Sequence, residues 1–297
     1  MNPNNKFKVS PLIIGTMRLG AWGAKMSTQE LENFIDACVD HGFTDFDHAD
    51  IYGNYTEESN FGAVIKRRPD LPSKIQITSK CGIKLTCPNR PDHKIKYYDS
   101  TKAHIIWSAE NSLKELGVPY LDLLLLHRLD YLMNPHEVAE AITQLKYAGK
   151  VKNFGVSNFT PSQFEMLHSF TPIVSHQVEI SALHRNAFED GTLDKCLKHK
   201  IIPTAWSPLA GGILCQKTKD PGILKVQNVL ENLSKKYEAG YDQILLVWLK
   251  KHPANIVPIL GTTKIERILK AKAALRIELT HQEWYEIWQA ASGKEVL

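Results

Sequence analysis

The chain has 297 residues, of which 43% are hydrophobic, so it can bury the core of one α/β barrel or of two smaller domains. Its formal net charge of +4 is mild and its basic residues are dispersed, so we expect no nucleic-acid-binding surface. No apolar run approaches the roughly 18 residues that cross a bilayer, so we expect no membrane span.

The cysteines and the N-terminal residues bear on the cellular compartment. The five cysteines are scattered and contain no Cys-x-x-Cys pair, which favours reduced thiols over disulfides. Residues 1–6 are polar and lack the apolar core of a signal peptide. We therefore expect a cytoplasmic protein.

A short apolar run followed by an amphipathic helical run recurs along the chain. Apolar runs of this length, some alternating and some continuous, are typical of strands. The predicted strands cover residues 12–17, 42–46, 74–80, 120–126, 151–156, 173–180, 201–206 and 256–260. The predicted helices cover about 27–40, 56–68, 101–116, 135–149, 193–199, 223–237, 243–250 and 263–275, with two more beginning at 160 and 280.

Several helix starts carry the residues of a capping box, in which a hydroxyl and a carboxylate or amide three residues later satisfy free backbone amides. These pairs are Ser27 with Glu30, Thr160 with Gln163, Thr263 with Glu266, and Thr280 with Glu283. Thr56 is predicted to cap the helix that reaches Arg68. The polar segment 82–99 is predicted to be a long loop, and loops of this length are often functional.

The alternation gives eight strand-then-helix units. Parallel strands need crossover helices, so strict alternation predicts a parallel sheet. Eight units in this length predict an α/β fold of the TIM-barrel type, a closed parallel (β/α)8 barrel with extra helices, formed by residues 1–297 as a single domain. The active site of such a barrel lies at the carboxyl ends of its strands, which brings distant residues together.

Four polar residues stand at the ends of the second, third and fourth predicted strands or just after them: Asp47, Tyr52, Lys80 and His127, hereafter the tetrad. A free phenol has a pKa of about 10 and needs a nearby cation to act as an acid or base at neutral pH. We expect Lys80 to lower the pKa of Tyr52, and Asp47 to hold Lys80. His127 can donate a hydrogen bond to an oxygen that gains negative charge, so proton transfer to a polarised carbonyl is the predicted chemistry.

Taken singly, each residue of the tetrad has a plainer interpretation. Lys80 could end a strand at the surface, His127 could be a hydrogen-bonded loop histidine, and Asp47 could cap a turn. Their coincidence at one end of a barrel favours a site. A metal site is the alternative, with Asp45, Asp47, His48, Asp50 and His127 as its ligands. Metal-dependent hydrolytic barrels, however, carry a His-x-His pair where this chain has Thr16-Met17-Arg18, so we expect no metal.

The ends of the seventh and eighth strands predict a second feature, a site for a phosphate-rich ligand. Barrels often bind phosphate in these loops, beside a helix N-terminus. Exposed backbone amides would come from the turn Ser207-Pro208-Leu209 with Gly211-Gly212, and from the turn Gly261-Thr262-Thr263. Nearby positive charge would come from Lys264, Arg267, Lys270 and Lys272. Tight turns and a solvated basic helix face are the alternatives. The chain has no P-loop and no Gly-x-Gly-x-x-Gly after a strand.

With these residues in place, the chain resembles the aldo-keto reductases over essentially its whole length. Six motifs in order carry the resemblance: Asp-x-Ala-x-x-Tyr-Gly at 47–53, Thr-Ser-Lys at 78–80, Leu-Leu-His at 125–127, Gly-Val-Ser-Asn-Phe at 155–159, Trp-Ser-Pro-Leu at 206–209 and Gly-Thr-Thr-x-x-Glu-Arg-Ile at 261–268. The resemblance implies NADPH-dependent reduction of a small aldehyde or ketone, with Tyr52 as the proton donor and the other three residues completing the tetrad.

The resemblance also implies contacts with NADPH or NADP+. The nicotinamide carboxamide would be bound by Ser157, Asn158 and Gln177, its ring would stack on Trp206, and its border would be formed by Gly15, Thr16, Met17 and Arg18. The phosphates would be held by Ser207 to Leu209 and by Gly261 to Thr263, and the 2′-phosphate would face Arg267. The sequence departs from the family pattern at Trp206, often a tyrosine, and at Lys270-Ala271, where many members carry Glu-Asn beside the adenine.

Substrate contacts are expected from Trp22, the 82–99 loop and the loops near Arg128 and Gly212, because the tail after Leu279 is short. An open pocket with broad specificity would follow. A different class of function is also compatible with the resemblance, since some proteins of this fold bind the cofactor and serve as accessory subunits of channels. We expect a monomeric enzyme, because no exposed apolar arm or N-terminal extension is evident.

Overall fold

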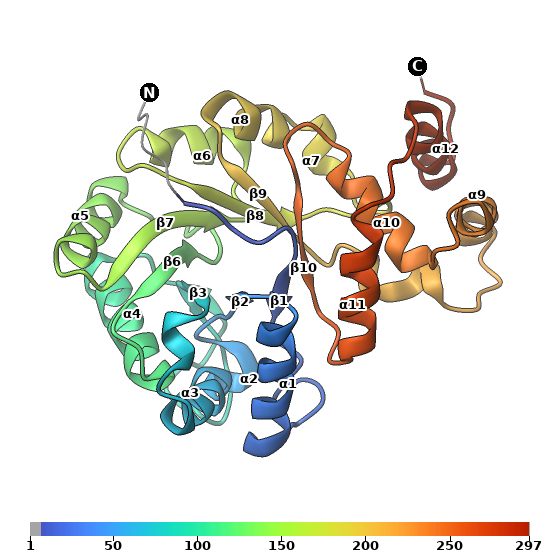
Figure 1. The fold of residues 1–297 in the computed structure, drawn as a ribbon. Coiled ribbons are helices and arrows are strands. Elements are labelled where there is room, and N and C mark those ends of the chain that lie inside the picture. Colours follow the sequence, from blue (N-terminus) through green and yellow to red (C-terminus); the bar gives the residue numbers. More distant parts are fainter. Residues whose placement is uncertain (1–6, 297) are drawn as a thin grey trace. The chain divides into compact units, whose positions relative to one another are not determined.

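Eight parallel strands form the barrel that the alternation of strands and helices predicts. The computed structural model describes residues 7–296, so the polar N-terminal residues behind the cytoplasmic prediction lie outside it. The barrel strands are β1 (Ile13–Gly15), β2 (Asp45–Asp47), β3 (Gln76–Cys81), β6 (Leu121–Leu126), β7 (Val151–Ser157), β8 (Ser175–Glu179), β9 (Ile202–Trp206) and β10 (Val257–Leu260). They close in the order β1-β10-β9-β8-β7-β6-β3-β2 (Figure 1). The predicted fold class is confirmed.

Helices follow the strands along the chain, as expected for parallel strands. They are α1 (Thr28–Asp40), α2 (Tyr52–Tyr55), α3 (Glu57–Arg67), α4 (Lys102–Leu116), α5 (Pro135–Tyr147), α6 (Pro161–His168), α7 (Asn186–Glu189), α8 (Thr192–His199), α9 (Pro221–Tyr237), α10 (Tyr241–Lys250), α11 (Ile265–Ala274) and α12 (His281–Ser292). Two short 3-10 helices, η1 (Leu71–Ser73) and η2 (Ala210–Cys215), complete them. The short helix α7 was not predicted, because four residues give too little periodicity to detect.

Three of the predicted capping boxes form. In α1, α6 and α12 the hydroxyl accepts from the third backbone amide and the acidic or amide side chain accepts from the cap amide. The predicted cap at Thr56 is wrong. Its hydroxyl instead donates to the carbonyl oxygen of Gly53 at 2.7 Å, and α3 begins at Glu57 without a side-chain cap. The reason is local, because a turn of unusual backbone conformation at 53–55 occupies the hydroxyl.

The segment 82–99, predicted as a loop, contains a small antiparallel hairpin. Its strands are β4 (Ile83–Lys84) and β5 (Tyr97–Tyr98), paired through Ile83 with Tyr98 and Lys84 with Tyr97. Strands of two residues lie below what an alternation pattern can reveal. We refer to residues 83–98 as the hairpin.

Strand register sets the level of the candidate site residues. Gly15 of β1 lies opposite Asp47 of β2, and Asp47 lies opposite Thr78 of β3. Lys80, two residues further along β3, lies opposite Leu125 of β6. Side chains two residues apart on a strand share a face. The register therefore places Lys80 one step beyond Asp47 and on the same side of the sheet.

The chain divides into two compact units, which are described separately. The first comprises the residues up to 177 together with 261–265, and the second comprises 178–260 together with the residues from 266 onward. The single domain expected from the sequence stays a prediction. In the first unit α3, α4 and α5 lie outside β3, β6 and β7 (Figure 1).

Helices α3 and α4 approach closely at a glycine of the first unit. A Cβ atom added at Gly62 on α3 would stand 2.0 Å from the carbonyl oxygen of Glu115 on α4. Such a distance is far inside van der Waals contact, so no larger side chain fits without a backbone shift. Gly62 therefore sets the spacing of this helix pair, at the usual cost of glycine in a helix.

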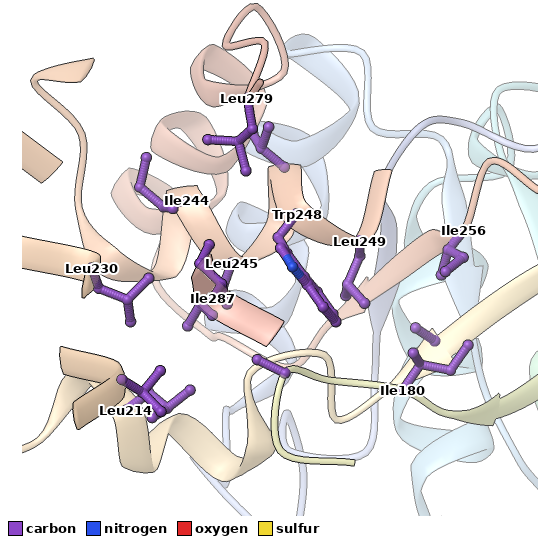
Figure 2. Packing of buried hydrophobic residues seen from close by; sticks show 14 of the residues in the cluster. Ile180, Leu214, Leu230, Ile244, Leu245, Trp248, Leu249, Ile256, Leu279 and Ile287 are labelled. Atoms are coloured by element: carbon purple, nitrogen blue, oxygen red, sulfur yellow. The ribbon is translucent and has the colours of Figure 1, made fainter. Parts of the chain in front are cut away.

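The core of the second unit is built around Trp248, whose side chain is fully buried (Figure 2). Its indole stacks on Trp284 of α12 with ring centroids 5.0 Å apart. Each indole nitrogen also donates to the backbone carbonyl of the other tryptophan at 3.0 Å. Because buried indole N–H groups need acceptors, this reciprocal pair satisfies both donors and fixes α12 against α10.

Membrane insertion through a helix finds no support in the described part of the chain. No helix within residues 7–296 combines the length and apolar character needed to cross a bilayer.

We expect Gly62→Ala to lower the free energy of unfolding by about 1–3 kcal/mol, because the added methyl group forces α3 away from α4. Urea denaturation followed by circular dichroism measures the change. Lys66→Ala, at an exposed position one turn later on α3, is the control and should stay within about 0.5 kcal/mol of the parent. Equal stability of Gly62→Ala and the parent would contradict the close approach.

Candidate active site

The four residues of the tetrad lie in the first unit, and Lys80 connects two of the others. Its ammonium donates to Asp47 Oδ2 at 2.7 Å, to the Tyr52 hydroxyl oxygen at 3.0 Å and to the carbonyl oxygen of His48 at 2.7 Å. An ammonium has three protons, so these three acceptors use all of them. The Lys80 side chain is 0% exposed. A buried cation this fully paired is held in one position.

Local chain geometry explains this convergence. Asp47 is the last residue of β2, Lys80 is the penultimate residue of β3, and His127 directly follows β6. Tyr52 opens the short helix α2 after a turn from Asp47. The ends of β2, β3 and β6 are neighbours, because these strands pair in that order. Residues separated widely in sequence therefore meet at one end of the sheet.

The pKa of Tyr52 differs in part from the prediction made from the sequence. Burial has the largest effect and raises the pKa of Tyr52, while the Lys80 charge lowers it and the Asp47 charge raises it again. The net pKa is above the usual value, so the expected lowering by Lys80 is real but smaller than the desolvation it opposes. Tyr52 therefore keeps its proton at neutral pH, as a proton donor requires.

Lys80 itself stays charged. Burial is the largest single effect and would lower its pKa, but the charges and hydrogen bonds of Asp47 and Tyr52 together outweigh it and raise the pKa. The Asp47–Lys80 pair is therefore a buried ion pair, with Asp47 supplying the counter-charge that lets the ammonium exist away from water.

His127 is half-buried and uncharged. Burial first, and then the charges of Lys80, Arg128 and Lys96, hold the pKa of His127 well below its ordinary value. Its ring lies edge-on to the Tyr52 ring, with centroids 6.1 Å apart. Within residues 7–296, its Nδ1 atom is buried and has no hydrogen-bond partner. A neutral imidazole can donate one hydrogen bond, and this ring lies beside the Tyr52 ring.

Gln177 makes a contact that the sequence did not predict. Its side-chain amide donates to Asp47 Oδ1 at 2.8 Å, so both oxygens of the Asp47 carboxylate are used, one by Lys80 and one by Gln177. The sequence resemblance had placed Gln177 only at the nicotinamide. The strand positions gave no sign of this bond, because Gln177 and Asp47 lie on strands that are not adjacent.

Ser157 ends β7 and lies opposite Gln177 in the middle of β8, and Asn158 follows it. The backbone amide of Asn158 donates to the Gln177 carbonyl oxygen at 2.9 Å, and its side-chain amide donates to Ser157 Oγ at 2.7 Å. Asn158 has a φ of 58°, a left-handed conformation that asparagine tolerates well. These three predicted cofactor residues therefore form one group of hydroxyl and amide functions.

The predicted residues after β1 divide into a buried and an exposed part. Thr16 is buried, and both its amide and its hydroxyl donate to the Asp47 carbonyl oxygen, at 3.1 and 3.0 Å. Gly15 is also buried, as the partner of Asp47 in the β1–β2 register. Met17 and Arg18 are exposed. Thr16 thus supports the backbone of Asp47.

The residues predicted to hold phosphates fall in both units. Gly261, Thr262 and Thr263 belong to the first unit and precede α11. In the second unit Trp206 ends β9, and Ser207, Pro208 and Leu209 follow it. The backbone there turns through left-handed residues, since φ is 49° at Ser207, 69° at Gly211 and 83° at Gly212. Arg267 is exposed in the first turn of α11. Phosphate binding by the two turns, the 2′-phosphate contact of Arg267 and the stacking of Trp206 on the nicotinamide all stay predictions.

Two buried carboxyl groups, one on α3 and one between β2 and α2, accept hydrogen bonds from serine hydroxyls. Ser79 donates to Glu58 Oε1 at 2.5 Å, and Ser108 donates to Asp50 Oδ2 at 3.0 Å. Burial is the main cause that raises the pKa of Glu58 to about 8 and of Asp50 to about 7. The sequence did not predict that these carboxyl groups are buried, because an acidic residue such as Glu58 is common in the first turn of a helix.

Comparison with known proteins gives one consistent result. The family model described as the aldo/keto reductase family matches residues 11–292. The uncharacterized oxidoreductase YcsN of Bacillus subtilis is 43% identical over 97% of this chain and 96% of its own length. The 6-dehydroglucose reductase of Agrobacterium fabrum is 38% identical over 99% of this chain and 98% of its own length.

Solved structures agree with the sequence comparison. A crystal structure of an aldo/keto reductase from Klebsiella pneumoniae, in complex with NADP and acetate, superposes with a TM-score of 0.76 at 26% identity. The superposition covers 94% of this chain and 90% of that one. The barrel and its order of elements are therefore those of an established family of structures.

The buried carboxyl of Glu58 makes stability depend on pH. The folded protein keeps the proton up to a pKa of about 8, whereas the unfolded chain releases it near the ordinary value of 4.5. Between these values the folded state binds more protons, so stability falls as pH rises. We expect the free energy of unfolding of Glu58→Gln to fall less than that of the parent between about pH 5 and about pH 9, by up to roughly 1.4 kcal/mol for each pH unit of the shift. The melting temperature of the variant should therefore depend less on pH.

Differential scanning calorimetry at a series of pH values measures this effect. Glu110→Gln, an exposed carboxylate on α4 paired with Lys150, is the matched control and should leave the slope unchanged. A Glu58→Gln variant that follows the parent at every pH would contradict the assignment of a buried, protonated Glu58.

Proposed function

Because the chain belongs to the aldo/keto reductase family, and relatives of similar length are named as oxidoreductases, we propose that it reduces an aldehyde or ketone to the alcohol with NADPH. In this proposal Tyr52 is the proton donor. The observation that carries the proposal is the Lys80 ammonium, held 2.7 Å from Asp47 and 3.0 Å from the Tyr52 hydroxyl. The arrangement suits an acid that must give up a proton inside the protein.

Lys80 serves Tyr52 through its charge. When Tyr52 donates its proton to the substrate oxygen, a phenolate forms in a buried position, where it is costly. The neighbouring ammonium offsets this cost, because opposite charges interact strongly away from water. Asp47 keeps the ammonium in place before the transfer, and the Gln177 amide keeps Asp47 in place.

His127 serves the substrate oxygen. Its neutral ring has one N–H to donate and lies beside Tyr52. A carbonyl oxygen that gains negative charge would accept from this N–H and from the Tyr52 hydroxyl together, which is the arrangement of an oxyanion site. The His127 hydrogen bond polarises the carbonyl, and Tyr52 completes the reaction by giving its proton to the alkoxide oxygen.

The residues present suit a nicotinamide cofactor. Ser157, Asn158 and Gln177 offer a hydroxyl and two amides in one group, which match the donors and acceptors of a carboxamide. Trp206 offers a flat aromatic face, and the turns at 207–209 and 261–263 offer backbone amides for phosphates. NADPH would supply the hydride when bound. The Klebsiella pneumoniae relative was solved with NADP, and the exposed Arg267 favours a 2′-phosphate over a bare hydroxyl.

The substrate is proposed as a class. The 6-dehydroglucose reductase relative suggests hydroxylated carbonyl compounds as the first substrates to try, beside simple aldehydes. The cytoplasmic location and the monomeric state both stay predictions. Size-exclusion chromatography would test the monomeric state.

We expect Tyr52→Phe to lower kcat by about 10²–10⁴-fold, because the proton donor is lost, while NADPH still binds with unchanged affinity. The measurement pairs NADPH oxidation with p-nitrobenzaldehyde or glyceraldehyde and a fluorescence titration with NADPH and NADH. Tyr147→Phe, a change at a tyrosine 96% exposed at the end of α5, is the control and should behave as the parent.

Two results would contradict this proposal. Parent-like turnover by Tyr52→Phe would remove Tyr52 as the acid. A parent protein that binds NADPH and reduces no carbonyl compound would favour a cofactor-binding accessory subunit.

A further inference from the structure

The backbone directly after Tyr52 passes through three consecutive residues in the left-handed region. Gly53, Asn54 and Tyr55 have φ of 58°, 59° and 67°. Glycine adopts this conformation freely and asparagine tolerates it, but tyrosine has no such preference. A succession of three left-handed residues is uncommon, and it persists only where surrounding contacts over-determine it. We refer to residues 53–55 as the left-handed turn.

The hairpin supplies contacts of this kind through Tyr55. The Tyr55 hydroxyl donates to the carbonyl oxygen of Ile83 at 3.3 Å and accepts from the backbone amide of Leu85 at 2.8 Å. The Arg90 guanidinium lies over the Tyr55 ring, 4.3 Å from its centroid. One side chain thus ties the last residue of the turn to the backbone of the hairpin at two points and to a hairpin cation at a third.

A second set of contacts holds the middle residue of the turn. The side-chain amide of Asn89, in the hairpin, donates to the carbonyl oxygen of Asn54 at 2.8 Å. The Trp22 indole donates to Asn54 Oδ1 at 3.3 Å. The Trp22 ring in turn lies 6.2 Å from the Tyr52 ring, measured between centroids. The turn is therefore held from the hairpin and from the segment that follows β1.

The turn and Tyr52 are directly coupled. The Thr56 amide donates to the Tyr52 carbonyl oxygen at 3.1 Å, so the turn closes onto the backbone of Tyr52 itself. Ile83 of the hairpin packs in the same buried cluster as Tyr52. Since the Tyr52 hydroxyl has to stay 3.0 Å from Lys80, a relaxed turn would misplace it. Misplacement of a reacting group by about 1 Å can cost on the order of a hundredfold in rate.

We propose that the hairpin is a positioning element for the proton donor, and that Tyr55 is its main positioning residue. The proposal rests on the proposed function, in which Tyr52 is the acid. Tyr55 acts through the left-handed turn, because its hydroxyl is occupied by the backbone of Ile83 and Leu85. The long segment 82–99 thus has a task that its sequence did not reveal.

The test uses Tyr55→Phe in the full chain, which removes one oxygen atom and keeps the ring under Arg90. We expect kcat to fall by roughly tenfold or more, while the Kd for NADPH stays within about twofold. The solvent deuterium isotope effect on kcat should rise, because proton donation becomes slower. Asn89→Ala, at the second tether, should give a smaller loss of the same kind.

Tyr98→Phe is the matched control. Tyr98 lies on β5 of the same hairpin and packs against the same cluster as Tyr52. In the described residues no hydrogen bond of its hydroxyl is found. This variant should keep the parent rate of hydrogen–deuterium exchange at residues 51–57, because it breaks no tether to the left-handed turn.

A second measurement needs neither cofactor nor substrate. Hydrogen–deuterium exchange of the peptide spanning residues 51–57 reports on the Tyr55 and Thr56 amides, which bond to the carbonyl oxygens of Ile51 and Tyr52. Exchange should speed up in Tyr55→Phe and not in Tyr98→Phe. Parent-like kcat and exchange in Tyr55→Phe, or equally faster exchange in both variants, would overturn the proposal. Faster exchange in a protein that reduces no carbonyl would support the tether and contradict the proposed function.

Discussion

A lysine ammonium without access to water is the group on which the candidate site depends. Taking a cation out of water is costly unless every proton finds an acceptor and the charge is balanced. Lys80 meets this demand with Asp47, the His48 carbonyl oxygen and the Tyr52 hydroxyl. The Tyr52 hydroxyl is thus the one neutral side chain among its acceptors, and the place where a new negative charge would be stabilised most.

This demand extends outward from Lys80 into the fold. Asp47 has to remain ionised and oriented, and Gln177 and Thr16 hold its carboxylate and its backbone. Tyr52 has to remain within reach, and the left-handed turn and the hairpin hold the chain behind it. His127 is desolvated in the same surroundings, which keeps its ring neutral. Strand register and the left-handed turn therefore serve one requirement, which is to hold Asp47 and Tyr52 against the buried charge of Lys80.

Much of this organisation could be predicted from the sequence, because it rests on local patterns. The eight apolar runs, the capping boxes and the tetrad positions at strand ends follow from periodicity and from the rule that parallel strands share a functional end. The features that were not predicted leave no periodic pattern. Gln177 reaches Asp47 across intervening strands, and the hairpin strands are only two residues long. The Thr56 hydroxyl turns to Gly53 because residues 53–55 are in the left-handed region. The pKa of Tyr52 also depends on desolvation, which a sequence does not contain.

The central claim is that Lys80 and Tyr52 act as one unit in proton donation. The most direct test is a double-mutant cycle on the single-turnover rate of carbonyl reduction, with Lys80→Met, Tyr52→Phe and the double variant. Residues that act as a unit are strongly non-additive. The account predicts that Lys80→Met alone is slower by about a hundredfold or more, and that the double variant is no slower than Tyr52→Phe. Losses that multiply, or a Lys80→Met variant with the parent rate, would contradict it.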